Sequence, residues 1–216
     1  MHVAIIGAHG KIARHLTRQL SGRGDHVRGI VRNPDHADDV ADDGAEPVLF
    51  DLEQAETAVL TRMIDGADAV VFAAGAGPGS GAARKETVDY GGAALLHAGA
   101  REAGVGRYLM VSAMGTDEPP QDEEVFSVYL RAKARADREL MASDRDWTVI
   151  RPGRLTHDPG RGLVEIARNV ERGSIPREDV AAVLRACLDD AATVGSVFEL
   201  VEGDTPIPEA LRALVS

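Results

Sequence analysis

A tyrosine and a lysine that could move a proton together lie four positions apart, as Tyr129 and Lys133 in the segment YLRAK. Side chains at this spacing share one face of a helix. A phenol is a poor base at neutral pH, but a nearby ammonium stabilises its anion and lowers its pKa. Tyr129 could therefore exchange a proton with a carbonyl or alcohol oxygen that Ser112 also contacts. Because chance often supplies YxxxK, the alternative is an interfacial tyrosine and a solvated lysine.

A turn of small residues, GAHGKIA at 7–13, is the second segment suited to chemistry. Glycine lets the backbone turn sharply and approach a ligand closely, and the following helix N-terminus offers unpaired N–H groups. Such a turn suits the linked phosphates of a dinucleotide, so we expect contacts from Gly7, Gly10 and Ile12. His9 and Lys11 would either touch phosphate or remain exposed. The alternative is a glycine-rich turn without a ligand.

Arg32 lies where the kind of dinucleotide would be selected. An NAD-binding turn of this type has an acidic residue about 20 positions further on that accepts from the ribose 2′-OH. Here VRNP at 31–34 ends the second predicted strand without a carboxylate. The guanidinium of Arg32 suits a 2′-phosphate, which favours NADP(H) over NAD(H), and Arg14 is a weaker second candidate for that phosphate. The alternative for Arg32 is a solvated surface arginine.

Two further strand ends complete the predicted cofactor site. Asp51, followed by Leu52, ends the third strand, where it would meet adenine or else cap the next helix. The fourth strand ends in Ala73, Ala74 and Gly75, whose small side chains would admit a ribose.

The elements that must position these residues alternate between short apolar runs and helical periodicity. We expect strands at 2–7, 26–31, 47–50, 69–74, 107–112, 147–150 and 196–201. Helices are expected at 11–20, 35–43, 55–64, 84–103, 125–142, 178–188 and 208–214. This alternation predicts an α/β fold, a doubly wound parallel sheet with helices on both faces. One domain would cover 1–216, with a small substrate-side cap within 151–216.

Composition restricts the classes of function. The 216 residues carry 35 acidic and 24 basic side chains, and the formal net charge of -11 repels a nucleic-acid backbone. No apolar run approaches the roughly 18 residues of a membrane span. The single cysteine, Cys187, cannot form an internal disulfide and is expected in the core, and the seven histidines lack the spacing of a metal site. We therefore expect a cytoplasmic monomer or small homo-oligomer with a small-molecule substrate and neither a nucleic-acid nor a membrane partner.

An acidic segment with two prolines, TDEPPQDEE at 116–124, separates Ser112 from Tyr129. A run of this kind is typical of a solvated loop. If it overhangs the site, its charge would disfavour strongly anionic substrates. The sequence leaves both arrangements open.

Taken together, the motifs resemble the short-chain dehydrogenase/reductase superfamily, in the atypical branch that includes NmrA-like, flavin/biliverdin reductase-like and NAD-dependent epimerase/dehydratase-like proteins. The resemblance covers nearly the whole chain and rests on IIGAHGKIA at 5–13, IVRNP at 30–34, VVFAAGAGPGSGA at 70–82, LMVSAMGT at 109–116, YLRAK at 129–133, DWTVIRPGRL at 146–155 and REDVA at 177–181. It implies a Rossmann-type sheet with the cofactor across the C-terminal ends of the strands. It also implies that Arg151 to Leu155 line the nicotinamide end.

The resemblance assigns catalytic roles to Ser112, Tyr129 and Lys133, and makes the last two cofactor contacts as well. Pro152, Gly153 and Leu155 would also contact the cofactor. Two departures stand out, because Asp89 occupies the place of an asparagine in many relatives and Ala13 that of a third glycine.

The function expected on these grounds is an NADP(H)-dependent oxidoreductase, with hydride transfer to or from a small carbonyl or alcohol and Tyr129 as the acid/base. One alternative is an NADP(H)-sensing, NmrA-like regulator with little catalysis, and the other is a sugar-nucleotide epimerase or dehydratase. The segment YLRAK favours an enzyme, since a sensor needs no phenol beside a lysine. The short chain after Pro152 disfavours an epimerase with a large substrate region.

Overall fold

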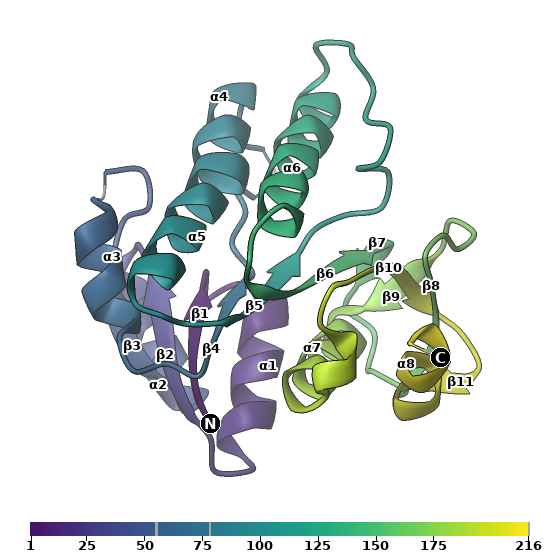
Figure 1. Cartoon of the computed structure of the whole chain (residues 1–216), viewed down its shortest axis with the longest axis horizontal. Coiled ribbons are helices and arrows are strands. Elements are labelled where there is room, and N and C mark those ends of the chain that lie inside the picture. The colour runs from purple at the N-terminus through teal and green to yellow at the C-terminus, as the bar shows by residue number, and fades with distance from the viewer. Residues whose placement is uncertain (55, 78, 216) are drawn as a thin grey trace.

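One large sheet forms the centre of the computed structural model, which describes every residue except Ala55, Pro78 and Ser216. The strand order is β11-β8-β10-β6-β5-β4-β1-β2-β3. Neighbouring strands from β10 through β3 are parallel, whereas β8 runs antiparallel to both β10 and β11. The predicted α/β fold with a doubly wound, mainly parallel sheet is confirmed (Figure 1).

The strands of this sheet are β1 (His2–Ile6), β2 (His26–Val31), β3 (Glu46–Leu49), β4 (Ala69–Phe72), β5 (Arg107–Val111), β6 (Asp146–Pro152), β8 (Leu163–Ala167), β10 (Ser196–Glu202) and β11 (Thr205–Pro206). A separate pair consists of β7 (Arg154–Thr156) and β9 (Ser174–Pro176). The helices are α1 (Lys11–Ser21), η1 (Pro34–His36), α2 (Ala37–Asp42), α3 (Thr57–Ile64), α4 (Ala82–Arg84), the π-helix η2 (Lys85–Gly92), α5 (Ala93–Glu102), α6 (Val125–Met141), α7 (Arg177–Asp189), η3 (Ala191–Thr193) and α8 (Ile207–Leu214).

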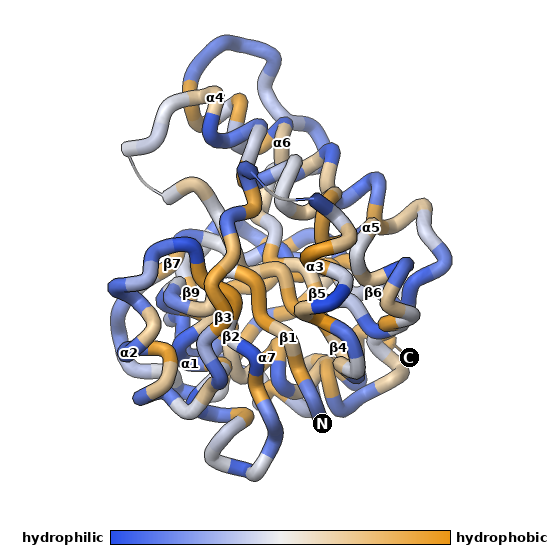
Figure 2. Tube along the Cα trace, turned by 90° about the vertical axis from the view of Figure 1, so that its left-hand side faces the viewer, coloured by the Kyte–Doolittle hydropathy of each residue, from blue (hydrophilic) through white to orange (hydrophobic). Residues whose placement is uncertain are grey.

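The sheet separates two hydrophobic cores. In β1, Val3 and Ile5 join one core while Ala4 and Ile6 join the other, because successive side chains of a strand point to opposite faces. Helices α1, α2, α7 and α8 contribute to the first core, and α3, α5 and α6 to the second. Figure 1 shows α1 beside α7 and α5 beside α6, and Figure 2 shows hydrophobic colours along the central strands. Burial on both faces explains why these strands are continuous apolar runs.

The strand order reverses between β1 and β4. The chain builds β1, β2 and β3 toward one edge and then returns to place β4 on the other side of β1. The helix that follows β1 and those that follow β4 therefore cover opposite faces of the sheet. In open α/β sheets this divergence leaves a crevice at the carboxyl ends of the strands, where ligands bind.

Several elements differ from the sequence prediction. The segment expected as one helix at 84–103 is divided into α4, the π-helix η2 and α5. In the region expected as a cap, β7, β8, β9 and β11 were not predicted. Three of them, β7, β9 and β11, have only two or three residues, which is too few to show alternation. The helix expected at 55–64 is described from Thr57, and Ala55 lies outside the described residues.

The structure also bears on membrane insertion, on metal binding and on the place of the cysteine. No helix in the described part of the chain is both long and apolar enough to cross a bilayer. The described residues include no group of three or more His, Cys, Asp or Glu side chains placed to hold a metal ion. Cys187 is buried in the first core, and this burial raises the pKa of its thiol to about 12. The prediction that Cys187 is a core residue is confirmed.

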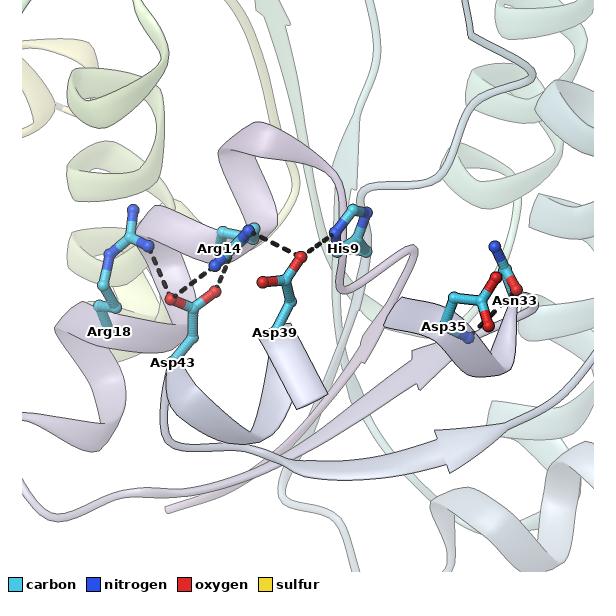
Figure 3. A network of polar contacts seen from close by, with 7 residues as sticks. All are labelled: His9, Arg14, Arg18, Asn33, Asp35, Asp39 and Asp43. Atoms are coloured by element: carbon cyan, nitrogen blue, oxygen red, sulfur yellow. Dashed lines mark hydrogen bonds and ion pairs between the residues drawn. The ribbon is translucent and has the colours of Figure 1, made fainter. Parts of the chain in front are cut away.

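An ion-pair network fastens α1 to α2 below the glycine turn (Figure 3). Asp43 accepts from Arg14 and from Arg18, whose Nη1 lies 2.7 Å from Oδ1. Arg14 also lies 3.3 Å from Asp39, which accepts from His9 at 2.8 Å. Arg14, the weaker candidate for a 2′-phosphate, is thus held between two carboxylates, and its role toward that phosphate stays a prediction.

Replacing Asp43 tests the stability that this network contributes. Desolvation opposes ionisation of Asp43, but the hydrogen bonds from Arg14 and Arg18 outweigh it and lower the pKa below 3.8. A depressed carboxyl pKa stabilises the fold above the unfolded value, and this contribution is lost as pH falls through the folded value. We expect Asp43→Asn to lower the free energy of unfolding by about 1–3 kcal/mol at neutral pH. Urea denaturation should show the difference from wild type shrinking below pH 3.8.

The neighbouring, exposed Asp42 provides the control. Asp42→Asn should change the free energy of unfolding by no more than about 0.5 kcal/mol. An Asp43→Asn deficit of the same size at neutral and acidic pH would show that packing, and not charge, is responsible.

Candidate functional site

A cavity of about 290 Å³ opens at the reversal point of the sheet, over the carboxyl ends of β1, β2 and β4. Its volume is near the lower limit of ligand pockets in proteins, which begins at roughly 300 Å³. The predicted cofactor residues that line it are Gly7, His9, Gly10, Arg32, Asp51, Leu52, Ala73, Ala74 and Gly75. Asn33, His36, Glu53, Arg84 and Val88 also line it and were not predicted. The structure thus gathers residues from five separate segments around one space.

The glycine turn allows the ends of β1 and β4 to touch. Gly7 has a φ of +81°, and a Cβ there would lie 2.6 Å from the Cα of Ala74. A Cβ on Gly10 would lie 3.0 Å from the carbonyl oxygen of Gly7. No side chain caps α1 at Gly10, and its first turn contains no acidic residue. The turn therefore leaves a bare helix N-terminus beside the cavity, which fits the phosphates of a dinucleotide.

Lys11 and Ile12 do not join the cavity. Ile12 packs into the first core with α1. Lys11 is exposed, and its Nζ lies 3.3 Å from Nε2 of His157. The pKa of His157 is lowered, chiefly by the charge of Lys11 and then by that of Arg177. His9, in contrast, does line the cavity, and its ring is stacked on that of His36 with 3.6 Å between the ring centroids. A contact between His9 and a phosphate stays a prediction.

Arg32 reaches a carboxylate that the sequence around the second strand does not contain. Its Nη1 donates to Oε2 of Glu53 at 3.0 Å, and about half of the Arg32 side chain is exposed. The same oxygen accepts from Nη2 of Arg84 at 2.9 Å. Thr87 donates to the other oxygen of Glu53 at 2.6 Å. The end of β2 itself has no carboxylate, as expected, and the carboxylate beside Arg32 is Glu53 from the turn after β3, which was not predicted.

Asp51 lies in the cavity wall and shapes the turn that carries Glu53. Its Oδ1 accepts from the backbone N–H of Glu53 at 3.0 Å. The alternative that Asp51 caps the next helix is wrong, because α3 begins later and its N-cap is Glu56. A contact with adenine stays a prediction.

Lys133 is buried and turned toward the ends of the strands. Its Nζ donates to the carbonyl oxygens of Val111 at 3.0 Å and Ala74 at 3.4 Å, and lies 3.7 Å from Oδ1 of Asp89. Burial lowers the pKa of Lys133, while the charge of Asp89 raises it again in part. Asp89 also accepts from the N–H of Ala76 at 3.1 Å, so the residue in place of an asparagine joins the loop after β4 to this lysine.

Tyr129 lies on the same helix, but its surroundings differ from those expected. Burial raises the pKa of the phenol above its ordinary value of 10.0, and the charges of Asp89 and Asp137 raise it further. The expectation that Lys133 lowers this pKa is wrong, because the ammonium is directed at backbone carbonyls and at Asp89. The Nζ of Lys85 lies 5.4 Å from the centroid of the Tyr129 ring.

Ser112 belongs to a buried polar cluster around Asp137. Its Oγ donates to Oδ2 of Asp137 at 2.9 Å, and the same oxygen accepts from Nε of Arg151 at 3.1 Å and from Thr116 at 3.2 Å. Burial raises the pKa of Asp137, although Arg151 and Ser112 act in the opposite direction. Asp137 was not predicted, but its position one turn after Lys133 on the same helix was an available signal.

The predicted nicotinamide end follows directly from β6 and lies outside the cavity. Pro152 ends β6, and the N–H of Gly153 donates to the carbonyl oxygen of Leu200 in β10 at 2.9 Å. Leu155 is part of β7 and packs against the first core. A Cβ on Gly153 would lie 2.5 Å from the carbonyl oxygen of Gly173, so this position requires glycine.

The π-helix η2 carries three side chains that reach this region. Lys85 donates to the carbonyl oxygen of Gly77 at 2.8 Å and faces Tyr129, Thr87 donates to Glu53, and Asp89 lies near Lys133. The wider turn of a π-helix often marks a functional site. No sequence signal distinguishes it from the α-helix expected there.

The acidic loop between β5 and α6 lies away from the cavity. Figure 1 shows it rising beside α6 to the start of that helix. Arg131 donates to the carbonyl oxygens of Pro120 and Asp122, both at 2.7 Å, and Nη1 of Arg151 lies 2.6 Å from Asp117. None of its residues lines the cavity that the structure describes. The loop is mostly exposed, as expected of a solvated segment.

Comparisons with known proteins agree with this arrangement. A family model described as NAD(P)H-binding matches residues 7–191. The protein named Uncharacterized sugar epimerase YhfK from Bacillus subtilis is 40% identical over 215 residues, which cover 99% of this chain and 100% of that protein. A solved structure from Bacillus halodurans, provisionally named an NAD-dependent epimerase/dehydratase, is 36% identical with a TM-score of 0.92, covering 99% of this chain and 100% of that one. The oxidoreductase ylbE from Lactococcus lactis is 26% identical with a TM-score of 0.86, covering 100% and 97%.

Substituting two glycines separates the strain of a positive φ from the close approach of Gly7 to Ala74. Gly24 has a φ of +92° with nothing within 4 Å of an added Cβ, whereas Gly7 has both the positive φ and the clash. We expect Gly24→Ala to cost about 1 kcal/mol and Gly7→Ala about 3 kcal/mol or more in the free energy of unfolding. If chemical denaturation gave the same loss in the free energy of unfolding for Gly7→Ala and Gly24→Ala, the close approach of Gly7 to Ala74 would contribute nothing to that loss.

Proposed function

Because the chain belongs to the NAD(P)H-binding family, we propose that it is an NADP(H)-dependent oxidoreductase that reduces a small carbonyl compound. The observation that carries the proposal is the cavity in which the glycine turn, small residues after β4 and the guanidinium of Arg32 meet. This set of residues fits a dinucleotide, with its pyrophosphate at the turn and its adenosine 2′-phosphate at Arg32. The structural relatives named for oxidoreductase and epimerase/dehydratase activities support a redox enzyme.

The proposed chemistry places Tyr129 as the proton donor. A bound reduced nicotinamide would supply the hydride to the carbonyl carbon. The phenol is protonated at neutral pH, since its ordinary pKa of 10.0 already lies well above 7 and burial raises it further, so it can give its proton to the carbonyl oxygen as negative charge develops there. The phenolate then recovers a proton from solvent.

The buried charges next to Tyr129 position this end of the site. Lys133 holds the carbonyl groups of Val111 and Ala74, and so joins α6 to the ends of β5 and β4. Ser112 donates its only hydroxyl hydrogen to Asp137, which leaves its oxygen a fixed acceptor for a hydrogen bond from substrate. We therefore assign Lys133 and Ser112 to orientation and Tyr129 to proton transfer.

A second candidate is an epimerase or dehydratase that acts on a sugar nucleotide. The 40% identical relative named as a sugar epimerase favours it, because that protein and this chain match over their whole lengths. The two functions differ in the fate of the coenzyme. A reductase oxidises one NADPH in each turnover, whereas an epimerase leaves the coenzyme in its starting oxidation state. Net oxidation of NADPH with a panel of aldehydes, ketones and quinones supports the first, and sugar conversion without net coenzyme change supports the second. Coenzyme binding without turnover of either kind would indicate a sensor.

Arg32→Ala tests the proposed preference for NADP(H). Loss of a charge-assisted contact to the 2′-phosphate should weaken NADPH binding by about 10- to 100-fold, and NADH binding by less than about twofold. The exposed Arg62 on α3 offers a control, because Arg62→Ala should leave both affinities unchanged. Calorimetric titration would contradict the assignment if Arg32→Ala weakened both coenzymes equally.

Tyr129→Phe tests the proposed proton donor. Loss of general acid catalysis should lower kcat by about 100-fold or more while NADPH affinity stays the same. Tyr90→Phe is the matched control, because the Tyr90 ring packs under Arg135 with 3.8 Å between the guanidinium carbon and the ring centroid. A kcat for Tyr129→Phe equal to that of wild type across the carbonyl panel would exclude Tyr129 from the chemistry.

A further inference from the structure

Glu53 holds the two arginines in the wall of the cavity. Its Oε2 accepts from Arg32 at 3.0 Å and from Arg84 at 2.9 Å and 3.3 Å, while its Oε1 accepts from Thr87 at 2.6 Å. The hydrogen bonds from Thr87 and Arg84 keep the pKa of Glu53 low, so the carboxylate is charged at neutral pH. The group joins the end of β2, the turn after β3, the end of α4 and the π-helix η2 across one side of the cavity.

Most of the charged donors in the cavity wall are directed at the Glu53 carboxylate. Arg32 and Arg84 are the guanidinium groups, and Asp51 and Glu53 are the carboxylates. Asp51 uses one oxygen to accept from the N–H of Glu53. The hydroxyl of Thr87 and two guanidinium groups therefore converge on Glu53, whose side chain is about one-fifth exposed.

These donors are the kind that recognise a phosphate monoester. A guanidinium binds a carboxylate and a phosphate through the same planar fork, and a phosphate presents three acceptor oxygens where a carboxylate presents two. Glu53 thus occupies, on the protein's own chain, the position of an anion between two arginines. A 2′-phosphate that reached Arg32 would meet repulsion from the carboxylate until Glu53 moved aside.

We propose that Glu53 competes with the 2′-phosphate of NADP(H) for Arg32 and Arg84, and that Arg84 is the second arginine that this phosphate engages. The inference rests on the proposed binding of a nicotinamide coenzyme in this cavity. The need to displace Glu53 weakens NADP(H) binding. It does not weaken NAD(H) binding, because the 2′-hydroxyl of NAD(H) can donate a hydrogen bond to the Glu53 carboxylate. Glu53 therefore sets the ratio of the NADP(H) affinity to the NAD(H) affinity, and Arg84 contributes only to the NADP(H) affinity.

Titration of two neutral variants with NADPH and NADH tests the competition. Glu53→Gln keeps the shape of the side chain without its charge, and should tighten NADPH binding about tenfold while NADH binding stays the same or weakens. Arg84→Gln should weaken NADPH binding about tenfold and change NADH binding by less than about twofold. In the double variant, the gain from Glu53→Gln should be smaller, because one of the released arginines is missing.

Glu86→Gln is the matched control, since Glu86 forms an exposed ion pair with Arg135 at 2.7 Å and does not line the cavity. It should leave the NADPH to NADH affinity ratio unchanged. An unchanged ratio in Glu53→Gln, or a loss of NADPH affinity there, overturns the competition, and should that variant not fold, unchanged NADPH affinity in Arg84→Gln overturns it alone. If wild type binds neither coenzyme, the proposed function fails and this inference fails with it.

Discussion

The contact between the ends of β1 and β4 is the constraint on which the site depends. Gly7 approaches Ala74 so closely that any side chain would overlap the backbone of the neighbouring strand. This approach lies where the strand order reverses and the two following segments leave toward opposite faces. Its consequence is a space bounded by backbone, with an uncapped helix N-terminus on one side and small side chains on the other. Arg32 and Glu53 then give that space its charge.

The part of the site around Tyr129 depends on buried, paired charges. Lys133, Asp89, Asp137 and Arg151 are all nearly inaccessible to solvent. Buried charges are tolerated only when they are paired and hydrogen-bonded, and removing one partner leaves the other uncompensated. The helix α6, the π-helix η2 and the ends of β4, β5 and β6 are therefore held in one arrangement around Tyr129. Such rigidity suits a site that must align a proton donor with a reacting carbonyl.

The local sequence was sufficient to predict the parallel strands of the sheet, the glycine turn and the strand ends, because each is encoded within a few residues. Gly7, Arg32 and Ala73 to Gly75 lie directly after apolar runs, so their position at one edge follows from parallel strands. Glu53 and Arg84 could not be placed in the same way, since the position of a turn and of a one-turn helix depends on tertiary packing. The environment of Tyr129 was misjudged for a related reason. Helical spacing shows which residues share a face, but not that Lys133 is drawn toward the carbonyls of Val111 and Ala74.

A crystal structure of the protein grown with saturating NADPH would test the central claim most directly. We predict that the pyrophosphate lies against the backbone between Gly7 and Gly10 at the start of α1, with the adenosine sugar between Asp51 and Arg32. A coenzyme bound elsewhere on the protein, with the glycine turn free of phosphate, would contradict the account.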